Sequence, residues 1–190
     1  MNLVLIFLSA AVVNNFVLTR FLGLCPFLGV SKNIGSSLYM GLAVTVVITL
    51  SAAAGHVAYN FALVPLELEY LHLIVFIVII ASLVQFLEIV LRKVSPALFS
   101  ALGVFLPLMA TNCIIVGVVL INITEAQTLA EAVASGFGGG VGFFIAIVVF
   151  AGIRERLEKS DIPDLFKGFP ISVIAAGLMS FAFLGFVGLI

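Results

Sequence analysis

The chain has 190 residues, of which 64% are hydrophobic and 9% are charged, and its formal net charge at pH 7 is −1. A typical soluble domain carries about 25% charged residues, and a chain with the present balance cannot cover its surface with polar groups. The composition therefore excludes a soluble globular protein and gives no indication of a nucleic-acid partner, so we expect the lipid bilayer to surround this chain.

Six apolar runs follow one another along the chain, each close to or above the roughly 20 residues that a membrane-spanning helix needs. They predict an all-α integral membrane protein that forms a single membrane domain over residues 1–190. The predicted transmembrane segments are residues 2–30, 38–60, 71–91, 97–121, 130–152 and 170–190.

The first segment is longer than one span requires and contains residues that interrupt a helix. Asn14, Asn15 and Arg20 lie within it, and Cys25 is followed directly by Pro26. Proline removes a backbone hydrogen-bond donor, and buried amide side chains must find partners in hydrocarbon. We therefore expect the helix to be broken near Cys25.

The fourth segment has the same character, because it contains Pro107 and then the run Thr111-Asn112-Cys113. The two cysteines of the chain stand in one six-residue pattern, Cys-x-x-apolar-Gly-Val, at residues 25–30 and 113–118. Irregular backbone at membrane depth is tolerated only where protein or a cavity shields it. Matching interruptions in the two halves of a chain point to a binding site.

The lysine and arginine residues fall in alternate loops. The second and fourth loops contain none and carry Glu67, Glu69 and Glu125 instead. By the positive-inside rule, the first, third and fifth loops face the cytoplasm, and both termini lie on the other side of the membrane. Those three loops hold Lys32, Arg92, Lys93, Arg154, Arg156, Lys159 and Lys167.

Three spans in each half give the halves opposite orientations, which indicates an inverted repeat of residues 1–95 and 96–190. The repeated cysteine pattern supports this division. A second repeated pattern, Ser-x-x-x-Gly, opens segments 2 and 5 at Ser37/Gly41 and at Ser135/Gly139.

Three interpretations of the two thiols stay open from the residues alone. They could form a disulfide, they could be small buried apolar residues, or they could bind iron. A [2Fe–2S] cluster normally takes four thiolates, so this chain would need two more from another chain. Asn14, Asn15 and Asn112 would then either bond the sulfur atoms or cap the broken helix ends, and we favour capping.

The remaining polar residues favour structural roles. Arg20 suits an interface. Glu88 is four residues before Arg92, the spacing of an ion pair on one helix face. The glycines between Gly136 and Gly142 would let segment 5 pack closely on a neighbour, and the loop from Arg154 to Asp164 offers a surface for partner subunits.

Long stretches of the sequence resemble one family of membrane subunits, found in the Rnf ion-translocating ferredoxin:NAD oxidoreductase and in the sodium-translocating NADH:quinone oxidoreductase. The resemblance covers essentially the whole chain and is nearest to the RnfA type. It rests on VNNFVLTRFLGLCPFLGVSK (13–32), VQFLEIVLRKVSPALF (84–99), LGVFLPLMATNCIIVGV (102–118), AGIRERLEKSDIP (151–163) and AAGLMSFAFLGF (175–186).

The resemblance implies a subunit of a bacterial inner-membrane translocase that is not catalytic by itself. It implies that Cys25 and Cys113 bind one [2Fe–2S] cluster together with two cysteines of an RnfE-like sister subunit of opposite orientation. Electrons would cross the membrane through that cluster, coupled to Na⁺ or H⁺ transport, with RnfB, RnfC, RnfD and RnfG types as further partners. An NqrE-type subunit, a secondary transporter with inverted repeats and a cluster-free scaffold are the alternatives.

Overall fold

The computed structural model describes residues 3–13, 15–31, 33–65, 69–94, 109, 111–161, 163 and 166–185. Every regular element within these ranges is helical, as expected for a chain whose backbone must satisfy its own hydrogen bonds in lipid. The helices are α1 (Leu3–Leu8), α2 (Phe16–Arg20), α3 (Leu24–Val30), α4 (Ile34–Ala58), α5 (His72–Val94), α8 (Cys113–Thr124), α9 (Leu129–Glu158) and α10 (Phe169–Leu184), with π-helical turns at Ser9–Val13 and Tyr59–Leu63 and a 3₁₀ turn at Glu69–Leu71.

Among the described residues, three helical stretches are long and apolar enough to cross a bilayer, namely Ile34–Phe61, His72–Val90 and Leu129–Glu158. The helices Cys113–Thr124 and Phe169–Leu184 are apolar but shorter. These stretches confirm a helical membrane protein. The count of six spans and the inverted repeat stay predictions, since residues 95–108, with the boundary between the two halves, are outside the described ranges.

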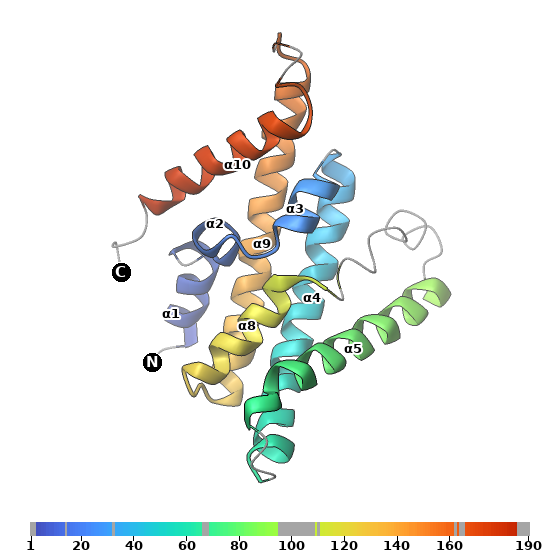
Figure 1. Ribbon diagram of the computed structural model, residues 1–190, viewed down its shortest axis with the longest axis vertical. Helices are drawn as coiled ribbons and strands as arrows, with labels where there is room; N and C mark the ends of the chain where they lie inside the picture. The colour runs from blue at the N-terminus through green and yellow to red at the C-terminus, as the bar shows by residue number, and fades with distance from the viewer. Residues whose placement is uncertain are drawn as a thin grey trace.

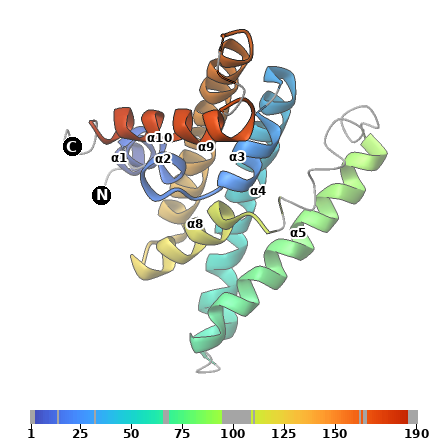
Figure 2. The ribbon, with the colours of Figure 1, turned by 45° about the horizontal axis from the view of Figure 1, so that its top comes forward.

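The two longest helices, α4 and α9, run side by side in opposite directions through the middle of the molecule (Figures 1 and 2). Glycines allow their close approach. A Cβ atom on Gly140 would lie 2.8 Å from the Cα atom of Thr45, and one on Gly136 would lie 2.8 Å from the Cβ atom of Ala52. Any side chain at these positions would push the helices apart.

Other glycines of α9 bring the N-terminal segment equally close. A Cβ atom on Gly138 would lie 2.8 Å from the carbonyl oxygen of Phe7, and one on Gly142 would lie 2.8 Å from that of Ala11. The glycine-rich run therefore packs α9 between α4 on one side and the segment from α1 to the first π-helical turn on another, as the sequence predicts.

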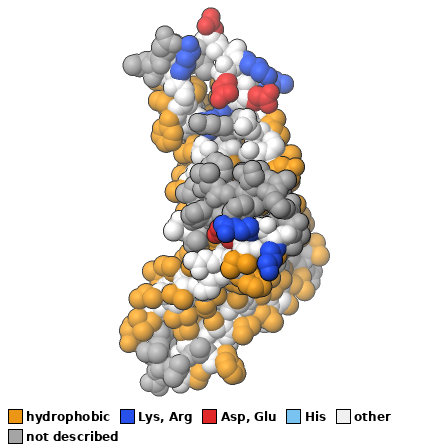
Figure 3. All heavy atoms as spheres, turned by 90° about the vertical axis from the view of Figure 1, so that its right-hand side faces the viewer, with side chains coloured by type: hydrophobic (Ala, Val, Ile, Leu, Met, Phe, Trp, Pro, Cys, Tyr) orange, Lys and Arg blue, Asp and Glu red, His pale blue; other side chains and the backbone are white. Residues whose placement is uncertain are grey.

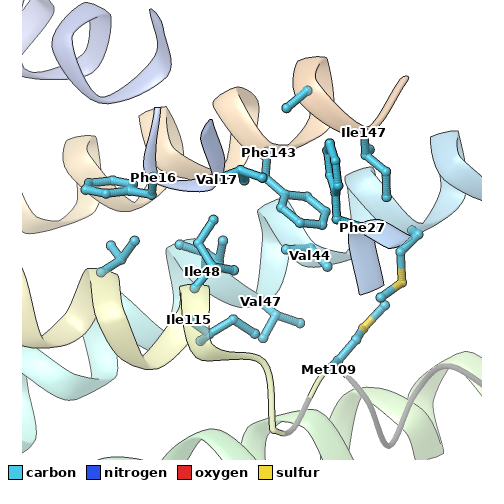
Figure 4. Packing of buried hydrophobic residues seen from close by; sticks show 14 of the residues in the cluster. Phe16, Val17, Phe27, Val44, Val47, Ile48, Met109, Ile115, Phe143 and Ile147 are labelled. Carbon is cyan, nitrogen blue, oxygen red and sulfur yellow. The ribbon is translucent and has the colours of Figure 1, made fainter. Parts of the chain in front are cut away.

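The hydrophobic core lies where α3, α4, α8 and α9 meet (Figure 4). Its largest fully buried side chains include Phe27 of α3 and Phe143 and Phe150 of α9. The rings of Phe27 and Phe150 stack with their centroids 4.4 Å apart. This contact fixes the short helix α3 against the long helix α9.

Hydrophobic side chains also cover most of the exterior, and charged side chains gather at one end and near the end of α5 (Figure 3). Ile74, Val78 and Phe86 of α5 and Leu178 and Phe181 of α10 are each more than half exposed. Exposed apolar helix faces are stable in lipid or against another membrane subunit, which agrees with the composition.

Helix α9 extends beyond the predicted end of segment 5 at residue 152. It runs to Glu158, because no glycine or proline follows Gly152 until Pro163 and the intervening residues are good helix formers. The prediction that Arg154 lies in a surface loop is therefore wrong. Its side chain is buried, with 7% of its surface exposed.

Candidate metal centre

The chain turns sharply just before Cys25. Helix α2 ends at Arg20 and α3 begins at Leu24, and between them Phe21 and Gly23 adopt left-handed backbone angles, with φ values of 55° and 85°. Only glycine adopts this conformation without strain. The break that the sequence predicts near Cys25 therefore exists, and Cys25 lies in the first turn of α3.

Cys113 is the first residue of α8. Asn112 caps this helix, because its Oδ1 atom accepts a hydrogen bond from the N–H group of Ile114 at 3.3 Å. An N-cap of this kind stabilises a helix start by about 1 kcal/mol. The cap places Cys113 at the positive end of the helix dipole.

A hydrogen bond joins the two cysteine motifs. The N–H group of Gly23 donates to the Sγ atom of Cys113 over 3.0 Å. Since Gly23 is two residues before Cys25, this bond brings the two motifs together, although the cysteines are far apart in sequence. Helices α3 and α8 start beside each other here and run toward opposite ends of the molecule (Figure 1).

Both thiols are free, and both cysteine residues are exposed on the surface of the chain. The structure therefore contains no disulfide between them, and neither is a buried packing residue. Cys25 lines a hollow of about 660 Å³ together with Leu28, Gly29 and Arg154. The two sulfur atoms are available to a ligand or to another chain.

Asn15 holds the broken first segment in place. Its Oδ1 atom accepts from the N–H group of Val17 at 3.1 Å, which caps α2. Its Nδ2 group donates to the carbonyl oxygens of Gly142 at 2.9 Å and Ala11 at 3.5 Å. Each polar atom of this buried side chain thus has a backbone partner, which is the capping role that we favour. Asn14 is outside the described residues.

Asn112 differs from Asn15 in having a donor to spare. The residue is 1% exposed, and its Nδ2 group has no hydrogen-bond partner among the described residues. Because Oδ1 caps α8, the orientation of the amide is fixed and Nδ2 is the unused group. A buried donor without a partner is costly, so this group is available to an acceptor at the Cys113 site.

The donor set suits iron bound by sulfur, but it is incomplete. Within the described part of the chain, no cluster of three or more histidine, cysteine or acidic residues could hold a metal ion. Thiolates are the usual ligands of iron–sulfur clusters, and N–H groups directed at Cys113 would stabilise negative charge on its sulfur. The residues therefore fit half of a [2Fe–2S] site.

The other sequence-predicted residues lie away from the cysteines or in ordinary structural contacts. Glu88 pairs with Arg92 over 3.9 Å, as the spacing predicts. Arg20 is exposed and lines a separate hollow with Glu125. The sequence interpretation missed Gly23, whose only signal is a glycine two residues before Cys25, and it missed the contact of Arg154 with α3.

Comparison with known proteins gives one consistent family. Residues 3–190 match the family model described as "Rnf-Nqr subunit, membrane protein". A protein of Acetobacterium woodii, named as part of the Na(+)-translocating ferredoxin:NAD(+) oxidoreductase complex, is 53% identical over 100% of this chain and 98% of its own length.

Two further relatives are named as the corresponding component of an ion-translocating oxidoreductase complex. The protein of Syntrophotalea carbinolica is 49% identical over 100% of this chain and 98% of its own. That of Psychromonas ingrahamii is 52% identical over 98% of this chain and 97% of its own. All three resemble this chain along its whole length.

Proposed function

The chain belongs to the Rnf-Nqr family of membrane subunits, and we propose that it acts as the RnfA-type subunit of an ion-translocating ferredoxin:NAD oxidoreductase. In this role it is part of a translocase and is not catalytic alone. Cys25 and Cys113 supply two of the four thiolates of a [2Fe–2S] cluster, and a homologous sister subunit supplies the other two. The names of the relatives favour this over an NqrE-type subunit.

The hydrogen bond from Gly23 to the sulfur of Cys113 carries the proposal. It holds two exposed thiols of one chain at neighbouring positions in the fold, each at the start of a helix. When bound, a [2Fe–2S] cluster accepts and releases one electron at a time. The chain's own part is to hold two ligands, to direct N–H groups at Cys113 and to keep both thiols on a surface that a second subunit can reach.

The inverted repeat is part of the same proposal. Its support is that α3 and α8 begin at the cysteines and run in opposite directions, and that α4 and α9, which carry the repeated Ser-x-x-x-Gly pattern, are antiparallel (Figure 1). Six spans as two halves of three would follow, with segments 1 and 4 broken beside the ligands. The basic loops would then face the cytoplasm of a bacterial inner membrane, and both termini the other side.

The partners follow from the missing ligands. Two thiolates leave half of the cluster's ligand set to another chain, and we assign that half to a sister of opposite orientation. The names of the relatives refer to a complex of several subunits, so subunits of the RnfB, RnfC, RnfD and RnfG types would exchange electrons with this pair. Transport of Na⁺ or H⁺ would be driven by the resulting electron flow.

Electron paramagnetic resonance of the dithionite-reduced membrane subunits, purified together with the sister, tests the proposal. We compare wild type with Cys25→Ser and Cys113→Ser and measure iron in each. Ser82→Ala, a small exposed substitution on α5, serves as the control. We expect each cysteine variant to lose the [2Fe–2S] signal while the subunits still purify together, and the control to keep it. Signal and iron retained in both cysteine variants would refute the proposal and favour a transporter or a scaffold.

A further inference from the structure

Arg154 is a buried positive charge without an acidic partner. It is 7% exposed, and no carboxylate of the described residues lies within 4.0 Å of its guanidinium. A buried charge is costly unless hydrogen bonds or an opposite charge compensate it. Two residues away, Arg156 is exposed, so burial is specific to Arg154.

The hydrogen bonds of Arg154 go to the helix that carries Cys25. Its Nη1 group donates to the carbonyl oxygen of Leu28 at 2.6 Å and to the hydroxyl oxygen of Ser31 at 3.0 Å. Leu28 belongs to the last turn of α3, whose carbonyl groups lack partners within the helix. The guanidinium thus closes the C-terminal end of α3, about one helical turn beyond Cys25.

A second contact holds α3 to the same stretch of α9. The ring of Phe150, one turn before Arg154, stacks on Phe27 with centroids 4.4 Å apart. Phe27 and Leu28 are the second and third residues after Cys25. An apolar stack and a charged hydrogen-bond pair together fix the orientation of α3, and hence the position of the thiol at its start.

Arg154 also lines the hollow that contains Cys25. Glu158 lines it too, but that side chain is exposed, so water screens its charge more than it screens the buried guanidinium. The net charge around an iron–sulfur cluster is one of the factors that set its reduction potential. A buried cation beside the cluster makes the addition of an electron easier.

We infer that Arg154 is a positioning residue of the Cys25 ligand, which it holds through α3, and that its buried charge raises the reduction potential of the metal centre. This inference rests on the proposed function. The role differs from that of an ordinary structural ion pair, because the acceptors are the end of the ligand-bearing helix and the nearest unneutralised charge would be the metal centre itself.

The test uses Arg154→Gln, Arg154→Lys and the matched control Arg156→Gln in the purified complex, with a redox titration followed by electron paramagnetic resonance. We expect Arg154→Gln to lower the ratio of reduced to oxidised cluster at a fixed potential about tenfold, which is a downward shift of about 59 mV for one electron. Arg154→Lys keeps the charge and should change the ratio less than about threefold, and Arg156→Gln less than about twofold.

A second measurement does not need the cluster. In a Cys113→Ser background, we compare the rate at which a maleimide labels Cys25. Arg154→Gln should change that rate several-fold, since the end of α3 loses its anchor, while Arg156→Gln leaves it unchanged. Equal potentials and equal labelling rates in Arg154→Gln and Arg156→Gln would overturn the inference.

Two further results are decisive in the same way. If the wild-type complex holds no cluster, the proposed function fails, and the labelling rate alone decides whether Arg154 positions Cys25. If Arg154→Gln does not assemble, Ser31→Ala takes its place, because it removes one acceptor and keeps the charge. Unchanged labelling in both Ser31→Ala and Arg154→Lys would then overturn the inference.

Discussion

Phe21 and Gly23 reverse the chain between two helices within three residues, and both hold left-handed backbone angles. For Phe21 this conformation costs about 1–2 kcal/mol. Such strain persists only where the surrounding structure enforces it, and it concentrates at functional sites. Here it places the N–H group of Gly23 on the sulfur of Cys113.

Replacement of Gly23 by alanine should therefore damage the site. The new Cβ atom would lie 3.3 Å from side-chain atoms of both Ile114 and Phe143, in a backbone conformation that alanine adopts only with strain. We expect a loss of about 1–2 kcal/mol of stability and less iron in the purified complex, because the N–H group moves away from Cys113.

The matched control is Gly29→Ala, a site on the same helix as Cys25 where a Cβ atom meets nothing within 4 Å. Midpoint temperatures of unfolding in detergent and iron content are measured for both variants. Equal iron content in Gly23→Ala and Gly29→Ala would mean that the bond from Gly23 does not organise the thiols.

Asn112 and Arg154 illustrate how far single residues can be interpreted from the sequence. An asparagine before a broken helix predicts a cap, and the structure confirms that cap. The charged neighbours of Arg154 predict a loop, yet the helix continues and buries this residue. No local pattern distinguishes a buried arginine from an exposed one, since burial depends on where α3 lies.

At the scale of elements, the C-terminal end of α8 has a tight turn with an unsuitable residue. Ala126 has a φ value of 47°, its N–H group donates to the carbonyl oxygen of Ile123, and the N–H group of Gln127 donates to that of Asn122. This is the Schellman arrangement, in which glycine is preferred at the left-handed position. Ala126 is exposed, so its methyl group contributes little packing.

We therefore expect Ala126→Gly to stabilise the protein by about 0.5–1 kcal/mol, because relief of strain exceeds the entropy that glycine adds to the unfolded chain. Ala130→Gly, an exposed substitution on the first turn of α9, should lower stability instead. Midpoint temperatures in one detergent decide the matter. A lower midpoint for Ala126→Gly would show that this turn is not strained.

The packing of α9 on α4 leads to a prediction of opposite signs for two glycines of one helix. Gly140→Ala would bring a Cβ atom to 2.8 Å from the backbone of Thr45, whereas at Gly152 a Cβ atom meets nothing within 4 Å. We expect Gly140→Ala to cost about 1–3 kcal/mol through overpacking. Gly152→Ala should gain up to about 1 kcal/mol through helix propensity.

Unfolding midpoints of the two variants in the same detergent test this pair. A gain in both would mean that α4 and α9 separate without penalty, and that the glycine run has no packing role. The result also bears on the inverted repeat, because Gly41 of α4 allows an equally close contact from the other side, where a Cβ atom would lie 2.6 Å from the ring of Phe144.

For the whole molecule, periodicity and composition predict the class of fold, and polar interruptions predict where segment 1 breaks. The sequence does not predict that Gly23 bridges to Cys113, because contacts between the halves depend on how α3 and α8 are packed against α9. Nor does it predict that α9 runs to Glu158, since the positive charges that mark a loop are equally compatible with the last turns of a helix.

Orientation in the membrane is the property on which the proposed arrangement with a sister subunit depends. Lys159 and Glu125 are exposed and lie beyond opposite ends of α9, near Glu158 and Leu129. Seven of the eight basic residues fall in the loops that we assign to the cytoplasm. Glu125 should therefore face the outside of the membrane and Lys159 the cytoplasm.

Single cysteines introduced as Glu125→Cys or Lys159→Cys in a Cys25→Ser, Cys113→Ser background measure this orientation. A membrane-impermeant maleimide should label Glu125→Cys in intact spheroplasts, whereas Lys159→Cys should react only after the membrane is opened, because the positive-inside rule holds its loop in the cytoplasm. The cysteine-free background is the control for non-specific labelling. The reverse pattern would invert this subunit in the bilayer, and the sister subunit would then need the orientation that we assign to this chain.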